Sequence, residues 1–154
     1  MTGSIFAARA MYNIAVHGWQ VTHVDGDGDE PSFSYTTGLT ADHRLELIVD
    51  ALSPLVAHYL LNRLAGMRNL ASGTTVLGML GADGEFAVQL FDVPDLSDMS
   101  ITRMVYGACF PALAVVIPDT DGRWPWDTGF ALQRYPNRTH TPKDYDWSSD
   151  GRSS

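Results

Sequence analysis

The chain has 154 residues, 45% of them hydrophobic and 10% aromatic, so it is long and apolar enough to bury the core of about one domain. Its formal net charge of −8 argues against binding to DNA or RNA and to anionic membrane surfaces, because both depend on Lys and Arg. A single cysteine, Cys109, excludes an internal disulfide and a disulfide-stapled secreted fold.

The first half of the chain predicts a helix followed by a β-hairpin. We expect the helix over residues 5–16, capped by Ser4 and ended by His17-Gly18. Its inward face is expected to comprise Ile5, Ala8, Met11 or Tyr12, and Ala15 or Val16. Residues 19–24 and 33–37 predict two strands joined by an acidic turn over residues 25–31.

A third strand and a second helix follow the hairpin. Residues 45–52 are largely apolar and predict the strand, and Ser53-Pro54 then supplies an N-cap and a first-turn proline. The helix is expected to end near Gly66. The apolar stripe of this helix is Leu55, Val56, Tyr59, Leu60 and Leu64, which we expect to face the core.

The second half predicts strands at 74–80, 85–93 and 112–117. A third helix is expected before the last strand, capped by Ser97 or Asp98 and reaching about Tyr106. Its inward residues are expected to be Ile101, Met104 and Val105. The pattern predicts an α+β fold, a largely antiparallel sheet with about three helices packed on one face. We expect one domain over residues 1–134 and a polar, flexible tail over 135–154.

The segment from Pro118 to Asp127 holds two tryptophans, an arginine and three aspartates directly after the last predicted strand. An indole is a large apolar group, so Trp124 and Trp126 should pack on a surface. Two interpretations stay open. The loop closes over its own sheet while Arg123 pairs with Asp119 or Asp127, or it forms an interface, where Trp and Arg are enriched.

Five short motifs together resemble the domain-of-unknown-function 4262 family, a bacterial and phage family. They are Gly18-Trp19, the run from Phe33 to Leu39, Glu46-Leu47-Ile48-Val49, Leu60-Leu61-Asn62, and the segment from Pro118 to Asp127 with its Gly122-Arg123 and Pro125-Trp126. The resemblance spans about Gly18 to Phe130. The chain departs from the family at His43-Arg44-Leu45-Glu46, where the family's His-Pro-Glu is interrupted by an extra residue and has no proline. The resemblance implies a small cytoplasmic domain and no established activity, cofactor or catalytic residue.

Sequence patterns for catalysis are missing. The acidic turn that starts at Asp25 has Glu30 and Thr36 where a calcium loop needs Gly and Glu, and no histidine pair has the spacing of a zinc site. The chain has no Gly-x-Ser-x-Gly elbow and no glycine-rich phosphate loop, and Cys109 is expected to be a buried, unreactive hydrophobic residue. We therefore predict no catalytic residue, no metal and no cofactor. No run is apolar enough for a membrane span or a signal peptide, which favours a cytoplasmic protein.

Two functions fit these observations. The first is a binding module that acts by association with a protein partner or with itself, for example as a homodimer. The second is an enzyme or small-ligand-binding domain, with a pocket between residues 35–39, His43 with Glu46, and residues 119–127, because loops at strand ends gather sites. The candidate binding residues are Tyr35, Thr36, Gly38, His43, Glu46, Asp119, Arg123, Trp124, Trp126 and Asp127.

Overall fold

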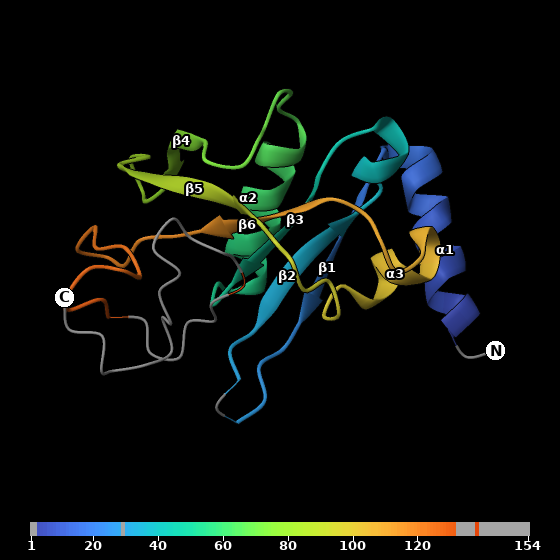
Figure 1. The fold of residues 1–154 in the computed structure, drawn as a ribbon, viewed down its shortest axis with the longest axis horizontal. Coiled ribbons are helices and arrows are strands. Elements are labelled where there is room, and N and C mark those ends of the chain that lie inside the picture. The colour runs from blue at the N-terminus through green and yellow to red at the C-terminus, as the bar shows by residue number, and fades with distance from the viewer. Residues whose placement is uncertain (1–2, 29, 132–137, 139–154) are drawn as a thin grey trace.

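The computed structural model describes residues 3–28, 30–131 and 138 of the chain. This part folds as one six-stranded, mostly antiparallel sheet with three α-helices, which confirms the predicted α+β class (Figure 1). In chain order the elements are α1 (Gly3–His17), β1 (Gln20–Val24), β2 (Phe33–Thr37), the 3-10 helix η1 (Leu39–Asp42), β3 (Glu46–Asp50), α2 (Pro54–Ala65), β4 (Thr75–Leu80), β5 (Phe86–Asp92), α3 (Ser100–Tyr106) and β6 (Ala112–Val116).

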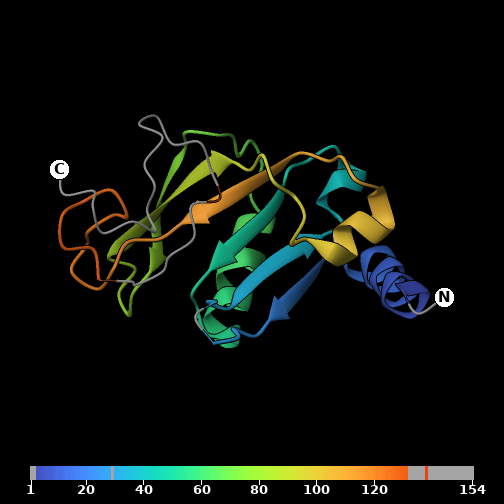
Figure 2. The same ribbon diagram turned by 60° about the horizontal axis from the view of Figure 1, so that its bottom comes forward.

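The strand order is β1-β2-β3-β6-β5-β4. Each neighbouring pair is antiparallel except β3 and β6 at the centre, which run parallel with Glu46 opposite Ala112 and Val49 opposite Val115. Because these two strands start at the same edge of the sheet, the segments before them lie together and the segment after β6 lies at the opposite edge. Figure 2 shows α1 and α3 at one end and the loop after β6 at the other.

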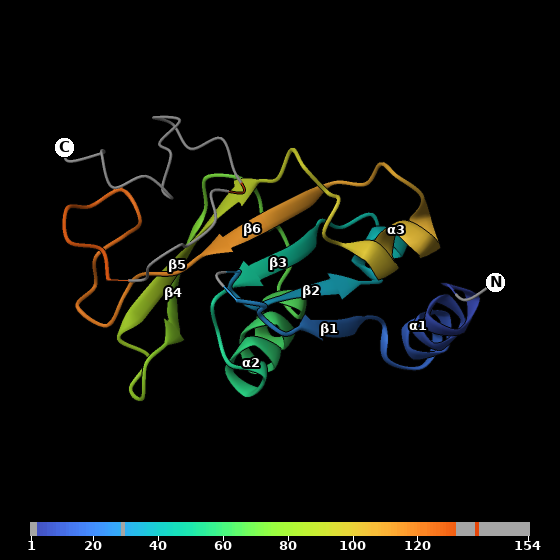
Figure 3. The ribbon, with the colours of Figure 1, turned by 90° about the horizontal axis from the view of Figure 1, so that it is seen from below.

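The helices occupy both faces of the sheet, which corrects the expectation of one face. Alternate side chains of β3 separate into two clusters: Leu47 and Val49 pack with α2, whereas Ile48 packs with Tyr35 and with the segment from Val93 to Phe110 that contains α3. The strands at the centre are buried on both sides because both faces are covered. Figure 3 shows α1 beside α3, beyond the end of the strands.

Helix α2 confirms the predicted start and shows a different buried face. Ser53 caps the helix through Val56 N–H, Pro54 is its first residue, and Gly66 is the C-cap. Its buried residues are Ala57, Leu60, Leu61, Leu64 and Ala65, whereas Leu55, Val56 and Tyr59 are exposed. The prediction was wrong for those three, because the helix face that packs on the sheet is the one with Ala57 and Ala65, whose small side chains allow close approach.

Helix α1 also turns a different face inward, and α3 does so in part. α1 begins at Gly3, so Ser4 lies within it, and Ala10 is its buried residue while the predicted inward residues face solvent. α3 begins at Ser100 with Met99 as N-cap, so neither Ser97 nor Asp98 caps it. The buried residue of α3 is Thr102, because the Thr102 hydroxyl donates to the Thr36 carbonyl at the polar end of β2. Of the predicted inward residues, Ile101 is partly buried against the core, Val105 is half-buried and Met104 is about half exposed.

Two further expectations concern Cys109 and the tail. Cys109 is exposed, not buried, because it lies in the connection between α3 and β6 and the buried position falls to Phe110. The predicted flexible tail over 135–154 lies outside the described residues except for Arg138. None of the described helices is both long and apolar enough to cross a membrane.

Candidate functional site

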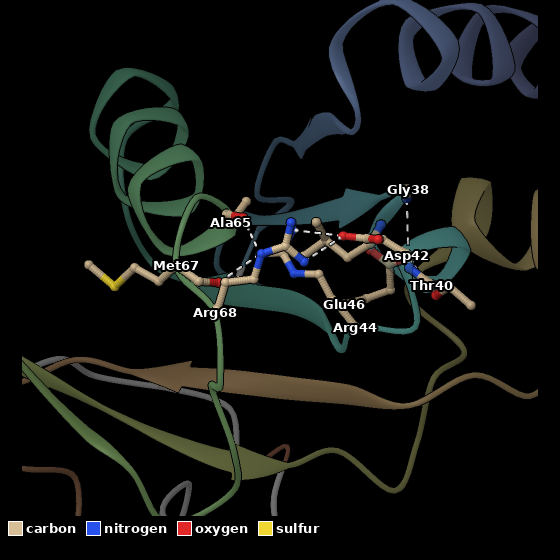
Figure 4. Close-up of polar contacts among 9 residues, drawn as sticks. Gly38, Thr40, Asp42, Arg44, Glu46, Ala65, Met67 and Arg68 are labelled. Carbon is tan, nitrogen blue, oxygen red and sulfur yellow. Dashed lines mark hydrogen bonds and ion pairs between the residues drawn. The ribbon is translucent and has the colours of Figure 1, made fainter.

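Glu46 is the centre of the densest polar network that the predicted site residues form. It is the first residue of β3 and is fully buried. Its carboxylate accepts five hydrogen bonds, from the N–H groups of Gly38, Leu39 and Thr40 and from the hydroxyls of Thr36 and Thr40, at 2.6–3.3 Å. Figure 4 shows the contacts to Gly38 and Thr40. The carboxylate therefore holds the start of η1 in place and anchors the connection between β2 and β3.

Gly38 joins this turn to the first family motif. Its φ of 132° lies in the region that favours glycine, and a Cβ there would approach the Gly18 carbonyl and the Trp19 Cα to 2.7 Å. The Trp19 indole N–H in turn donates to Asn62 Oδ1 on α2 at 2.8 Å. Four of the five motifs therefore meet at one place, where they hold α2, the hairpin and the β2–β3 connection together.

An arginine pair lies on the outer side of this connection (Figure 4). Arg44 donates to the Ala65 and Met67 carbonyls at the C-terminal end of α2, where a cation is favoured by the helix dipole. Arg68 pairs with Asp42 at 3.0 Å, and Arg44 lies 3.8 Å from the same carboxylate. A cleft of about 300 Å³ lies beside them and includes His43, which is exposed at the left-handed end of η1.

The tryptophan loop packs on its own sheet. Trp124 and Trp126 stack with ring centroids 5.6 Å apart, and Trp126 meets the Phe91 ring of β5 edge-on at 6.0 Å. Pro125 between them is buried, and Asp127 accepts the Trp124 N–H at 2.9 Å. This supports the structural interpretation of the loop, with both indoles partly buried against the core.

Asp119 closes the same loop from inside. Its buried carboxylate accepts the N–H groups of Asp121, Arg123 and Ala131 at 2.8–3.0 Å. Burial opposes ionisation, but these three donors and the Arg123 guanidinium outweigh it and hold the pKa of Asp119 below its ordinary value. The Arg123 guanidinium lies 4.0 Å from the Asp119 carboxylate and 3.0 Å from that of Asp121. Its closer partner is therefore Asp121, and not Asp127 as one prediction had it.

The structure brings only part of the predicted site together. Residues 35–39 and Glu46 are in contact, and His43 lies on the outer side of the same connection. Asp119 to Asp127 follow β6 at the opposite edge of the sheet, since Glu46 pairs with Ala112 at the start of that strand (Figure 1). The described chain therefore forms no single pocket between all three segments.

Sequence reasoning missed an ion cluster at the end of β3, in which Asp50 and Arg138 are largely buried and Asp98 is half exposed. Asp50 is 4% exposed and binds Arg138 through both carboxylate oxygens at 2.7 and 2.8 Å. Arg138 also contacts Asp98 at 2.7 Å and lies over the Phe33 ring at 5.0 Å. Burial raises the pKa of Asp50, and the arginine opposes this in part. No local signal could reveal a pair 88 residues apart.

The histidines give no metal centre in the described part of the chain, where no group of three or more His, Cys, Asp or Glu side chains is placed to hold an ion. His23 contacts Ser34 at 2.7 Å and Asp25 at 3.4 Å. His17 and His58 line a second cleft, of about 380 Å³, between α1, β1 and α2. His140 lies outside the described residues.

Fold and site together define a small α+β domain in which the shared motifs mainly fix backbone segments to one another. The chain belongs to the DUF4262 family, described as a domain of unknown function, which matches residues 13–131. Searches of curated proteins and of solved structures found no significant match. The family assignment confirms the resemblance drawn from the motifs, and leaves the activity open.

Proposed function

We propose that this protein is a cytoplasmic association module that pairs with a second copy of itself through the exposed face of α1. The observation that carries the proposal is the apolar stripe of this helix. Ile5, Tyr12 and Val16 are 70%, 67% and 54% exposed, and Met11, farther round the helix, is 59% exposed. At spacings of seven and four residues the first three lie on one helix face, where Ala8 and Ala15 also allow a close approach.

The surface is placed on α1 rather than on the tryptophan loop because the two indoles are already stacked on their own sheet. The α1 stripe has no such cover in the described chain, since α1 packs against α3 and β1 through its opposite side around Ala10. Contiguous exposed apolar surface of this kind marks interaction sites in soluble proteins.

Charge and register favour a second copy as the partner. α1 carries Arg9 and His17 and no acidic residue, although the whole chain has a net charge of −8. Two α1 helices can therefore meet without bringing carboxylates of either helix together. An antiparallel pair centred between residues 10 and 11 places Ile5 opposite Val16 and Arg9 opposite Tyr12, where the guanidinium can cover the ring.

The stripe supports a weak dimer. Complete burial of one apolar side chain contributes about 1.5–3 kcal/mol, so four that are half to two-thirds exposed supply roughly 5 kcal/mol per helix. Two helices supply about 10 kcal/mol, and association costs at least about 4 kcal/mol. At most about 6 kcal/mol therefore remains, which corresponds to a dissociation constant of tens of micromolar or weaker.

Sedimentation velocity from about 5 to 300 µM tests the proposal in that range. The wild-type chain should shift from monomer to dimer with concentration, and Tyr12→Glu should remain a monomer. Leu55→Glu is the matched control, because Leu55 is 81% exposed on α2 outside the stripe, and it should dimerise like the wild type. A wild-type chain that stays monomeric at the highest concentration, or equal dimerisation of both variants, refutes the proposal.

A second candidate, a small-ligand-binding function, is favoured by one observation. The cleft beside η1 is lined by His43, Arg44 and Arg68 and by one carboxylate, Asp42, which pairs with Arg68. Two guanidinium groups against one carboxylate leave it positive in a protein that is acidic overall, and so it suits a small anion. Titration with inorganic phosphate, followed by the amide resonances of residues 39–45 and 67–70, tests it with Arg68→Ala as the control variant. Saturable shifts that Arg68→Ala removes support this function, and their absence at 10 mM phosphate excludes a phosphate-sized ligand.

A further inference from the structure

The cluster at the end of β3 has the composition of a guanidinium pocket. Two donors of Arg138, Nε and Nη2, bind the two oxygens of Asp50, and a third, Nη1, binds Asp98. The Phe33 ring covers the guanidinium at 5.0 Å. A planar fork, two carboxylates and an aromatic face fit arginine, whereas the compact ammonium of lysine cannot make the paired contact.

The walls of this pocket are built without Arg138. Phe33 and Asp50 are direct partners across the β2–β3 ladder, and the next residue, Ala51, donates its N–H to the Ser32 carbonyl at 2.8 Å. Asp98 precedes Met99, which is 1% exposed in the core of that face. The pocket is therefore part of the sheet and its packed cover, and Arg138 enters it from a distant part of the chain.

The family match separates the pocket from its occupant. Phe33, Asp50 and Asp98 lie within the matched residues 13–131, and Arg138 lies outside them. The pocket also keeps an excess of negative charge when filled, since two carboxylates face one guanidinium. A site that belongs to the domain and still attracts a cation can also accept an arginine side chain from another molecule.

We infer that Asp50, Asp98 and Phe33 form a binding site for an arginine side chain, which Arg138 fills within its own chain and which an arginine of a peptide partner fills when Arg138 withdraws. Arg138 then acts as a tethered competitor. An arginine of the same chain competes at a high effective concentration, so it blocks weak ligands and yields to a peptide with further contacts.

The test uses the full chain and N-acetyl-arginine amide as the probe. Arg138→Ala should bind this probe saturably by isothermal titration and gain thermal stability from it, and the wild type should bind it at least about tenfold more weakly because Arg138 competes. N-acetyl-lysine amide, which has the same charge, should bind neither protein measurably. The double variant Asp50→Asn with Arg138→Ala should lose the response to arginine.

Equal responses of Arg138→Ala to the arginine and lysine probes, or equal binding of the arginine probe by wild type and variant, overturn the inference. If Arg138→Ala does not fold, Arg138→Gln replaces it, because glutamine keeps polar contacts without a cation that would occupy Asp50. Failure of Arg138→Gln to bind the arginine probe then counts against the site. Dimerisation through α1 is measured separately and does not depend on either result.

Discussion

Replacement of Glu46 by glutamine should destabilise the fold strongly, although the two side chains have nearly the same shape. The Glu46 carboxylate is fully buried, with Oε1 accepting from Thr36 and Leu39 and Oε2 from Gly38 and Thr40. An amide has one accepting oxygen, so in either orientation its NH₂ group faces a buried backbone N–H, that of Leu39 or those of Gly38 and Thr40, whereas a threonine hydroxyl can turn and accept.

The magnitude follows from the donors that lose their acceptor. One buried unsatisfied N–H costs about 1–3 kcal/mol, and the hydrogen bonds that remain lose the extra strength of a charged acceptor, so the total loss is about 2–4 kcal/mol. Domains have stabilities of about 5–15 kcal/mol, so this loss is a large share of the total. For a chain of this size about 1 kcal/mol corresponds to 2–4 °C, and the melting temperature should fall by roughly 10 °C.

Urea unfolding followed by circular dichroism at neutral pH measures this loss directly. Glu30→Gln is the matched control, because Glu30 is exposed in the acidic turn and its substitution should change the free energy of unfolding by less than about 0.5 kcal/mol. If Glu46→Gln unfolds at the same urea concentration as the control, the carboxylate does not hold the β2–β3 connection and our account of the shared motifs is wrong.

Three further predictions concern backbone space and pH. Gly38→Ala should lose at least about 3 kcal/mol of unfolding free energy, whereas Gly73→Ala, at a positive φ of 89° with nothing within 4 Å of a Cβ, should lose only about 1–2 kcal/mol. Because the folded-state pKa of Asp119 is lowered, its ionised carboxylate stabilises the fold above the unfolded-state pKa, and this stabilisation disappears as the pH falls through the folded-state pKa. Urea unfolding between about pH 5 and pH 2 should therefore show that Asp119→Asn loses less unfolding free energy on acidification than the wild type does. Arg138→Ala should cost about 3–5 kcal/mol at neutral pH, and the deficit should narrow on acidification, because the folded-state pKa of Asp50 is already raised and protonation removes its unpaired charge. A deficit that stays constant from pH 7 to about pH 4 would contradict this explanation.

Local signals in the sequence predicted the elements well. Ser53 and Pro54 mark the start of α2, Gly18 ends α1 with a φ of 95°, and the alternation on either side of the acidic turn gave the first hairpin. These features depend on a few neighbouring residues, so a single sequence contains them. The fixed shape of the tryptophan loop was also foreseeable, because two indoles rarely remain unpacked.

The faces of the helices and the long-range contacts could not be read in this way. α1 and α2 each carry two apolar stripes, and only the tertiary neighbour decides which one is buried. Thr102 is buried because β2 ends in hydroxyls, a fact that concerns residues 65 and 66 positions away. The guanidinium pocket combines residues of a strand and a loop with a distant arginine, and none of these residues has a local sequence pattern that marks it.

The parallel pairing of β3 with β6 divides the sheet into two blocks that are each continuous along the chain. β1, β2 and β3 are consecutive neighbours, as are β4, β5 and β6, and the register from Glu46–Ala112 to Val49–Val115 is the strand pairing that links the blocks in the described sheet. The pairing of β3 with β6 joins residues far apart in the chain, so this pairing should form late in folding. The exposed stretch around Arg68 and Asn69 joins the blocks, and a chain cut there should yield two halves that reassemble on mixing.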